Sequence, residues 1–587
     1  MSEYLFSPKN CFIFFCTAIC IILAGVAWRL YHLNVSAAQP SLENLNSITV
    51  NDCGNALTND FYVLCGYYTT PRINNNNVQI PFVVIKKREV EHRNSIQTQW
   101  LSEQDVAVNA VSLKTPAQGH SSEDGSANLG LSNINWPENS FNLQDIFDEQ
   151  IPLVVLPGGP GSATGIQSKS LQYWLGWYHR QGLSEAVILM DYRGLGGSIP
   201  AVDCASTSSG SAAIEKLGLR LLENKLSINY SESELRFLSL VQCWQIAQNF
   251  GYSELDFSAE TNAIDLLGLA KLLNIHQLNI YARSYGTRVA VIAALQQSDL
   301  INSMVLDSLH SLENNDPNQW PLKYRQAFLN LIHYCKTSSL CSVTDDSLKR
   351  ALDYRKPVSA TNQNDVDTND TVKNSTVENS TAENSTAENK VSTNNSADFN
   401  YESYLAEAIF QKMREHNSAK NIQQLLTASK NDWYSDDASI NSQRVEFGDV
   451  VYFVNQCIDN NPIDHSVFSK NLGEIGYLSQ FVSYDTDTDF CRLLQYSNYL
   501  APYKSANVSV ETVLLAGGLD PVTQLSQVEA ANSHFLRSTL FVFPDAGHVL
   551  IDQYPCLDDA LPFLLHNQGS DYVYEHCSQQ SVRILIR

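Results

Sequence analysis

The feature of this sequence that most restricts its fold is a series of short apolar runs, each followed at once by a glycine-rich or polar turn. They occupy residues 152–156, 186–190, 278–281 and 304–306. Strands without a polar face are typical of a sheet that is covered on both sides. Helical patterns separate several runs, and residues 259–273 carry apolar side chains at spacings of three and four. This alternation predicts a mostly parallel α/β sheet.

Further strand patterns lie on both sides of a region with a different character. Residues 61–68 and 78–85 are rich in β-branched and aromatic residues, and strand-like runs return at 512–516 and 539–543. Between these groups, residues 311–500 contain helical stretches without the regular alternation. The pattern therefore predicts a sheet whose strands come from two separate parts of the chain.

The expected domain organisation follows from this break. The core is expected at residues 34–310 and 501–587, and residues 311–500 are expected to form an inserted, mainly helical lid. Inside the lid, near-identical Asn-Ser-Thr units repeat with almost nothing to bury. Residues 358–398, which contain these units, are therefore expected to be a disordered surface loop.

Ser284 lies in a short motif between a predicted strand and a predicted helix. The motif is Ala-Arg-Ser-Tyr-Gly, residues 282–286, and an apolar helical run follows at 289–295. In a nucleophile elbow, a serine sits on a sharp strand-to-helix turn between small residues. Here Ala282 replaces the usual glycine and is still small. A plain structural turn is the alternative for so short a motif, but the flanking strand and helix favour Ser284 as a nucleophile.

Two more polar residues follow predicted strands further along the chain. Asp520 comes after the run at 512–516, and His548 comes after the run at 539–543. The order serine, aspartate, histidine is that of the α/β-hydrolase fold. The sequence thus predicts this fold, with His548 as the base for Ser284 and Asp520 orienting the imidazole. A dehalogenase or an epoxide hydrolase would need aspartate at the elbow.

A glycine-rich loop, Pro-Gly-Gly-Pro-Gly at residues 157–161, directly follows an apolar run. An oxyanion hole needs two N–H donors aimed at the charge that develops on the substrate. We expect these donors to be the backbone amides of Gly159 and Tyr285. A phosphate-binding loop is the competing interpretation, but its glycine and lysine spacing is missing from this loop. The predicted chemistry requires no metal and no organic cofactor.

Five short motifs carry a resemblance to known proteins. They are Pro-Gly-Gly-Pro-Gly at 157–161, Asp-Tyr-Arg-Gly-Leu-Gly-Gly-Ser at 191–198, Arg-Ser-Tyr-Gly-Thr at 283–287, Gly-Leu-Asp-Pro at 518–521 and Ala-Gly-His at 546–548. Together they resemble the proline iminopeptidase and tripeptidyl aminopeptidase family of serine exopeptidases. The resemblance extends roughly over residues 50–310 and 500–560. It departs from the family at Pro157, where the family often has histidine.

The resemblance implies an α/β-hydrolase with a lid over the sheet that cleaves residues from the N-termini of peptides. Such an enzyme must bind a free α-ammonium group, and the lid offers Asp449 and Asp459 as candidate carboxylates. Solvated surface acids are an equally good interpretation of both, because exposed aspartate is common. Asp191 and Arg193, in the most specific motif, are expected to form a structural ion pair or to fix turns under the site.

Ten cysteines lie outside residues 11–28, scattered along the chain and without interleaved histidine. An even, scattered set is typical of disulfides rather than of a zinc site. Free buried thiols are the alternative. Connectivity does not follow from sequence, and the simplest pairing is sequential. It joins Cys53 to Cys65, Cys204 to Cys243, Cys335 to Cys341, Cys457 to Cys491 and Cys556 to Cys577.

Residues 1–33 are expected to be a signal anchor or a signal peptide. Residues 11–28 contain no charge and are just long enough to span a bilayer. An uncleaved anchor is favoured, although small-residue cleavage sites occur at 25–27 and 35–37. With the disulfides, this predicts an extracytoplasmic protein, periplasmic or at the cell surface, that contacts the membrane through this segment. The net charge of −24 argues against nucleic acid, so the expected partners are peptide substrates.

Two other functions are consistent with the same residues. A serine esterase or amidase would use the same three side chains, because the selectivity for an ester or a peptide depends on the lid pocket and not on these side chains. A hydrolase-like ectodomain used for binding, without catalysis, is the second alternative. The complete set of Ser284, Asp520 and His548 argues against it. Neither the preferred P1 residue nor the oligomeric state follows from the sequence.

Overall fold

A computed structural model of the protein describes most of the chain after residue 46. The described residues are 47–51, 60–71, 77–88, 147, 150–204, 232–312, 316–338, 341–353, 401–415, 417–427, 445–460, 463–481, 490–494, 503, 506–566 and 568–587. They all belong to one of two compact units, Asn46–Arg587. The predicted membrane segment at 11–28, the loop at 358–398 and Cys53 lie outside them. None of the described helices is long and apolar enough to cross a membrane.

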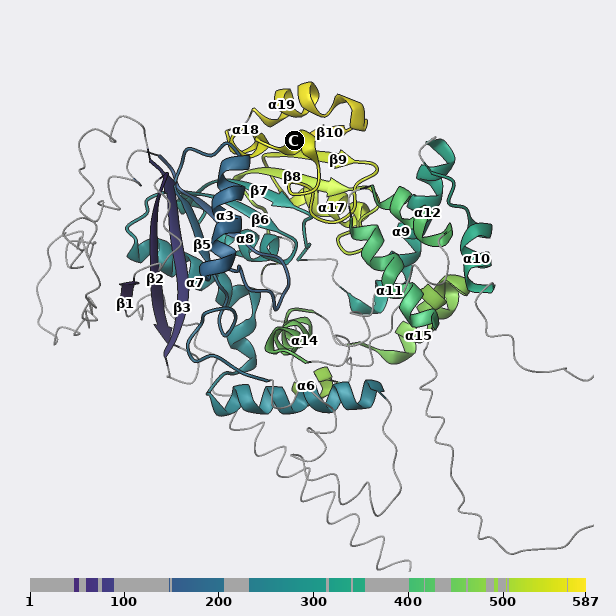
Figure 1. Ribbon diagram of the computed structural model, residues 1–587, viewed down its shortest axis with the longest axis horizontal. Helices are drawn as coiled ribbons and strands as arrows, with labels where there is room; N and C mark the ends of the chain where they lie inside the picture. Colours follow the sequence, from purple (N-terminus) through teal and green to yellow (C-terminus); the bar gives the residue numbers. More distant parts are fainter. Residues whose placement is uncertain are drawn as a thin grey trace, which may run out of the picture. The chain divides into compact units, whose positions relative to one another are not determined.

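The described residues form one ten-stranded sheet in the order β1-β2-β3-β5-β4-β6-β7-β8-β9-β10 (Figure 1). Its strands are β1 (Ser47–Asn51), β2 (Phe61–Pro71), β3 (Asn77–Lys87), β4 (Leu153–Leu156), β5 (Val187–Met190), β6 (Leu278–Arg283), β7 (Ile301–Asp307), β8 (Glu511–Gly517), β9 (Ser538–Phe543) and β10 (Arg583–Ile586). From β5 through β9 all neighbours are parallel. The mostly parallel sheet predicted from the apolar runs is thus confirmed.

The edges of the sheet are antiparallel, and they hold the two strands that the sequence patterns did not predict. β1 pairs with β2, Ile48 lying opposite Tyr68. β10 pairs with β9, and most of its residues are exposed. Short edge strands carry a weak pattern because only one side of each is paired and little of their surface is buried.

Helices of the described residues cover both faces of the sheet and also form the segment between β7 and β8. They are α3 (Ser168–Arg180), α6 (Glu232–Asn249), α7 (Ala259–Leu272), α8 (Tyr285–Gln296), α9 (Trp320–Thr337), α10 (Asp345–Asp353), α11 (Tyr401–Arg414), α12 (Ser418–Thr427), α14 (Phe447–Asp459), α15 (His465–Glu474), α16 (Phe490–Leu494), α17 (Leu525–Ala531), α18 (Ala560–Leu565) and α19 (Gly569–His576). α8 contacts β4, β6 and β7, and α7 packs against α8. α3 and α18 belong to the apolar core on the other face.

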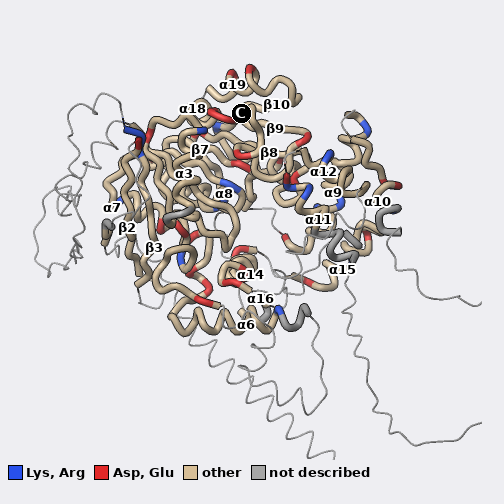
Figure 2. The backbone as a smooth tube through the Cα atoms, in the orientation of Figure 1, with Lys and Arg blue, Asp and Glu red and all other residues tan. Residues whose placement is uncertain are grey.

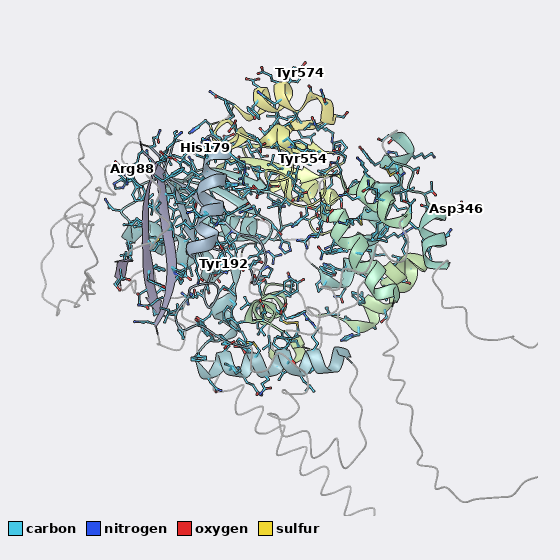
Figure 3. All side chains as sticks on the ribbon, in the orientation of Figure 1. Arg88, His179, Tyr192, Asp346, Tyr554 and Tyr574 are labelled. Atoms are coloured by element: carbon cyan, nitrogen blue, oxygen red, sulfur yellow. A yellow bond between two sulfur atoms is a disulfide. The ribbon has the colours of Figure 1, made fainter. Side chains whose placement is uncertain are left out.

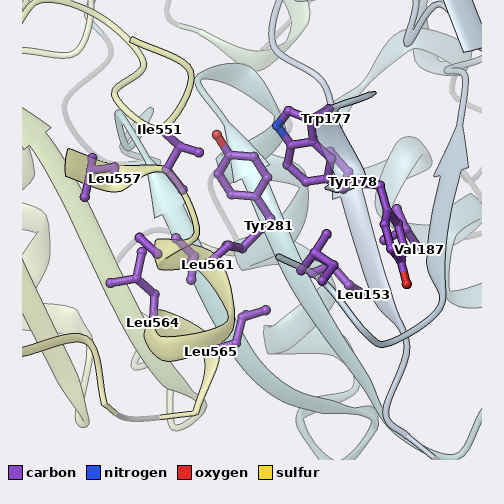
Figure 4. Close-up of a cluster of buried hydrophobic side chains, with 14 of the residues drawn as sticks. Leu153, Trp177, Tyr178, Val187, Tyr281, Ile551, Leu557, Leu561, Leu564 and Leu565 are labelled. Carbon is purple, nitrogen blue, oxygen red and sulfur yellow. The ribbon is translucent and has the colours of Figure 1, made fainter. Parts of the chain in front are cut away.

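The core between the sheet and α3 is built from large aromatic side chains. Trp177 of α3 stacks on Tyr281 of β6 with ring centroids 5.9 Å apart, and Leu561 of α18 lies in the same cluster (Figure 4). Burying one such side chain contributes about 1.5–3 kcal/mol. In the parallel strands β4 to β9, Lys, Arg, Asp and Glu occur only at a first or last residue; Figure 2 colours these residue types blue and red. The charged side chains of these strands therefore lie at the strand ends.

The chain leaves the sheet after β7 and returns to the neighbouring strand β8. Between them lie the helices from α9 to α16, as the helical patterns at 311–500 predicted. α9, α11 and α12 enclose their own apolar cluster around Phe328, Met413 and Ile422, which Leu519 joins from the turn after β8. The division of the chain into a split core and a lid stays a prediction.

Disulfides tie neighbouring segments together. Four of the predicted sequential pairs are present, and they join Cys204 to Cys243, Cys335 to Cys341, Cys457 to Cys491 and Cys556 to Cys577. Cys65 is also disulfide-bonded, and its predicted partner Cys53 lies outside the described residues. The interpretation of these eight cysteines as free thiols is therefore wrong.

Candidate active site

Ser284 sits at the sharp turn that joins β6 to α8. Its backbone has φ 50° and ψ −119°, a positive φ that serine rarely adopts. The turn needs close approach: a Cβ on Gly286 would lie 2.5 Å from the Pro157 carbonyl oxygen. Ala282, which replaces the usual glycine, is fully buried without disturbing the turn. The local geometry is that of a nucleophile elbow.

His548 lies between Ser284 and Asp520. Its Nε2 is 2.9 Å from the Ser284 Oγ, and its Nδ1 is 2.8 Å from the Asp520 Oδ2. All three side chains are buried. They lie in the turns after β6, β8 and β9. Because these strands are parallel, their carboxyl ends lie on the same side of the sheet. The structure therefore brings together the three residues that the sequence singled out.

Asp520 is held in place by its own turn. Its Oδ1 accepts the backbone N–H groups of Val522 and Thr523, at 2.7 and 3.0 Å. The Thr523 hydroxyl donates to Oδ2 at 2.6 Å, the oxygen that faces His548. These bonds hold Oδ2 where it can accept from the N–H at Nδ1 of His548, which leaves Nε2 free to accept from a hydroxyl.

The glycine-rich loop at residues 157–161 lies against the elbow. A Cβ on Gly158 would come within 3.3 Å of the Ser284 Cβ, so Gly158 is the glycine nearest to the hydroxyl. Gly159 follows with φ 122°. Tyr285 is the first residue of α8, where backbone N–H groups have no acceptor within the helix. The assignment of Gly159 and Tyr285 as oxyanion donors stays a prediction.

Tyr192 links the loop to the elbow (Figure 3). It follows β5, and its hydroxyl donates to the Pro157 carbonyl at 3.2 Å. Its ring meets the Tyr285 ring edge-on, with centroids 5.9 Å apart. Pro157, the residue at which the chain departs from the resembled family, therefore accepts this hydrogen bond through its backbone carbonyl oxygen.

Asp191 and Arg193 act separately, not as one ion pair. Asp191 fixes a turn by accepting the N–H groups of Thr164 and Gly197 at 2.7 and 3.0 Å. Burial raises the pKa of Asp191, and these N–H groups act against that shift. Arg193 forms buried ion pairs with two other carboxylates, Asp265 at 2.6 Å and Asp256 at 2.9 Å. The structural role expected for both residues is consistent with these contacts and stays a prediction.

A cavity of about 520 Å³ opens beside the glycine-rich loop. Its lining consists of Pro160, Gly161, Ser162, Glu446, Gly448, Asp449 and Tyr452. The loop joins the cavity to the elbow, since Gly158 lies against Ser284 and Gly161 forms part of the wall. Two carboxylates thus face the cavity from the N-terminal end of α14. The cavity can accept a positively charged group close to the loop.

Asp449 is the predicted carboxylate that reaches this cavity. Its side chain is 35% exposed and lies 3.8 Å from the Arg236 guanidinium. One of its oxygens accepts the Glu446 N–H at 2.8 Å, which caps α14. Sequence reasoning missed Glu446, because no pattern in the chain shows that its loop borders the glycine-rich loop. The signal available was its place three residues before Asp449, as in a capping box.

The prediction that Asp459 binds a substrate amine is wrong. The side chain is fully buried, and its Oδ2 accepts from the Ala259 N–H and from Asn455 Nδ2, at 3.2 and 2.8 Å. The Arg288 guanidinium lies 3.9 Å away. Burial raises the pKa of Asp459 to about 6, and Arg288 acts against that shift. An acid enclosed in this way caps α7 and cannot meet a ligand.

No described set of three or more His, Cys, Asp and Glu side chains is arranged to hold a metal ion. A sequence profile described as alpha/beta hydrolase fold matches residues 151–555, more than half of the chain. The chain belongs to the α/β-hydrolase family. Within this family, the elbow, the turns after β8 and β9 and the glycine-rich loop are the places where the reacting groups lie.

Individual relatives are distant. "Putative hydrolase YuaR" of Escherichia coli (strain K12) is 26% identical over 227 residues, which is 35% of this chain and 41% of that protein. The match therefore spans less than half of the relative. A solved proline iminopeptidase from Mycobacterium smegmatis is 14% identical, with 72% of this chain and 91% of that chain covered and a TM-score of 0.34. An esterase from Thermogutta terrifontis is 12% identical over 72% and 91%, with a TM-score of 0.28. Scores this low carry no argument about the reaction.

Proposed function

We propose that this α/β-hydrolase is a serine exopeptidase that removes residues from peptide N-termini through an acyl-enzyme on Ser284. The observation that carries the proposal is that one imidazole, His548, lies within hydrogen-bond distance of both Ser284 and Asp520. The cavity with two carboxylates supports the choice of a free amino terminus. The motifs shared with the proline iminopeptidase and tripeptidyl aminopeptidase family point in the same direction.

The geometry supports a two-step mechanism. His548 Nε2 takes the proton of the Ser284 hydroxyl while Oγ attacks the scissile carbonyl. Asp520 keeps Nδ1 protonated and stabilises the imidazolium that forms. The N–H groups of Gly159 and Tyr285 stabilise the oxyanion, and a donor of this kind contributes about 10²–10³ in rate. His548 then protonates the leaving amine, and water hydrolyses the acyl-enzyme by the reverse path.

Recognition of the substrate amine is assigned to Glu446 and Asp449. Both line the cavity next to Gly161, and both belong to the first turn of α14 or the residue before it. Arg236 neutralises Asp449 only in part, because the two are 3.8 Å apart and partly solvated. An ammonium group placed here would meet two carboxylates, while an acetylated terminus would bring no positive charge to pair with them.

The test is a digest of a peptide library read by mass spectrometry, with free and acetylated N-termini. Free peptides are expected to lose N-terminal residues, and acetylated peptides are expected to remain intact. The double variant Glu446→Gln and Asp449→Asn should lower kcat/KM for free peptides by about 10–100-fold, since charged hydrogen bonds contribute about 1.5–3 kcal/mol. Asp346→Asn is the matched control, an exposed acid on α10.

Two results would point elsewhere. Equal cleavage of acetylated peptides, with fast turnover of short acyl esters, would replace the exopeptidase by an esterase or amidase. Failure of a fluorophosphonate to label Ser284 in the folded protein would leave a binding protein. The wild-type labelling experiment therefore separates the hydrolase from its substrate class.

We also propose that the protein works outside the cytoplasm, held at a membrane by residues 11–28. The disulfides support an oxidising compartment, because such bonds are rare in cytosolic proteins. Protease added to cells with a permeabilised outer envelope and an intact cytoplasmic membrane should digest the protein. Without protease, the protein should stay with the membrane fraction after a salt wash. Recovery in the cytosolic fraction would refute this location.

A further inference from the structure

The backbone that follows His548 adopts a conformation unusual for its sequence. Val549 has φ 64°, a left-handed conformation that a β-branched residue avoids. The N–H groups of Val549, Leu550 and Ile551 all point to one place, the end of β7. Val549 donates to the Ser308 Oγ at 2.8 Å. Leu550 and Ile551 donate to the Asp307 carboxylate at 2.8 and 3.0 Å.

The same two residues hold the other two segments of the site through their backbone. The Asp307 carbonyl accepts the N–H of Ser284 at 2.9 Å. The Ser308 N–H donates to the carbonyl of Leu515 at 2.9 Å, in the strand that leads to Asp520. Asp307 and Ser308 therefore touch the nucleophile turn, the aspartate strand and the histidine loop without touching the three reactive side chains.

Burying a carboxylate is unfavourable unless hydrogen-bond donors replace the water that it loses. Asp307 and Ser308 are fully buried, and Ser308 itself has φ 61°. The Tyr281 hydroxyl donates to Asp307 at 3.1 Å and completes its set of donors. Burial raises the pKa of Asp307 to about 6, and the N–H groups of Ile551 and Leu550 act against that shift. Neither residue has a place in the proposed mechanism.

We propose that Asp307 and Ser308 are positioning residues that set the His548 ring relative to Ser284 by holding residues 549–551 in a turn with Val549 in the left-handed conformation. On the outer side, the His548 N–H donates to the Arg414 carbonyl at the end of α11, at 3.0 Å. The histidine backbone is thus fixed from β7 and from α11 at once. The inference rests on the proposed role of His548 as base and is independent of the substrate.

The test compares two matched truncations at the two ends of β7. Ser308→Ala removes the acceptor of the Val549 N–H. Ser303→Ala removes a hydroxyl of similar burial that donates to Asn279 at 2.9 Å, far along the strand from the turns. Both variants lose one buried hydrogen bond, so their melting temperatures should fall by similar amounts. The rate of fluorophosphonate labelling at Ser284 should fall at least tenfold in Ser308→Ala alone.

A third variant tests whether the left-handed turn is the cause. Glycine adopts a positive φ freely, so Val549→Gly in the Ser308→Ala background should recover about tenfold in labelling rate, the factor that about 1.4 kcal/mol of relieved strain corresponds to. With a peptide substrate, Ser308→Ala should lower kcat and leave KM unchanged. If Ser308→Ala does not fold, Asp307→Asn offers the same readouts at the neighbouring residue.

The outcomes divide cleanly. Labelling of Ser308→Ala as fast as that of Ser303→Ala, or equally slow labelling of both, would overturn the positioning role. No recovery on Val549→Gly would overturn the role of the turn. Absence of labelling in the wild type would instead refute the proposed hydrolase function.

Discussion

At the scale of single residues, reactivity is assigned to Ser284 by its surroundings. A serine hydroxyl is a weak nucleophile until a base lies within hydrogen-bond reach. The positive φ at Ser284 and the close approach at Gly286 aim the hydroxyl toward His548, which stands 2.9 Å away. Backbone strain of this kind persists only where the surrounding structure over-determines it. Here β6, α8 and the glycine-rich loop supply that constraint.

Asp520→Asn should lower kcat by about 10³–10⁴, because an amide facing Nδ1 favours the wrong imidazole tautomer. KM should change little, since Asp520 has no contact with the cavity lining. The matched control is Asp545→Asn, which alters a carboxylate on the same loop as His548 that accepts from the Tyr554 hydroxyl at 2.9 Å. Turnover of the best peptide or ester substrate measures the effect. Equal activity of the two variants would remove Asp520 from the mechanism.

At the scale of elements, α14 connects the cavity, the elbow and the core. Its first turn borders the glycine-rich loop, and its middle residue Asn455 donates to the Tyr285 hydroxyl at 2.8 Å. Its last residue, Asp459, caps α7 through the Ala259 N–H. α14 also packs against α6 (Figure 1). α14 therefore contacts both the glycine-rich loop and the first residue of α8.

Gly161→Ala should separate α14 from the glycine-rich loop. The added Cβ would lie 2.1 Å from the Gly448 carbonyl oxygen, and the residue has φ 87°. We expect kcat/KM to fall more than tenfold, because the cavity wall and the oxyanion loop move together. Gly473→Ala, in α15, is the control: its Cβ meets no atom within 4 Å, so it should stabilise the protein by roughly 0.5–1 kcal/mol. Enzyme kinetics and thermal unfolding measure both, and an active Gly161→Ala protein would contradict the close contact.

At the scale of the whole molecule, stability depends on pH through buried acids. The chain carries a net charge of −24. Among the described acids, Asp307 and Asp459 each have a pKa that burial raises to about 6. A raised pKa in an acid means that the folded protein binds a proton that the unfolded chain releases. The stabilisation is complete below the unfolded pKa and is lost as the pH rises through about 6.

Comparison of the wild type with Asp459→Asn isolates one of these acids. The variant keeps an acceptor for the Ala259 N–H and removes the titration. We expect the free energy of unfolding of the wild type, relative to the variant, to decrease by about 1–3 kcal/mol as the pH rises from about 4 to 7. Urea unfolding across this range measures the difference, in which the contribution of Asp307 cancels. A difference that does not change with pH would show that Asp459 keeps an ordinary pKa.

Much of the sheet and the reactive residues could be predicted from the sequence because both depend on local patterns. Apolar runs mark strands that are covered on both faces, and glycines mark the turns that expose Ser284. The order of Ser284, Asp520 and His548 indicates one family of folds. Sequential pairing of cysteines succeeded at the four described pairs, whose members lie 6 to 39 residues apart.

Only the tertiary structure decided which carboxylates border the cavity. Asp449 and Asp459 lie on one helix and look alike in sequence, yet the first borders the cavity and the second is enclosed beneath α7. Asp307 and Ser308 had no local signal at all, and Glu446 had only its spacing from Asp449. Their roles depend on contacts between segments more than a hundred residues apart in the chain, and burial and partnership at that separation are set by packing rather than by the neighbouring sequence.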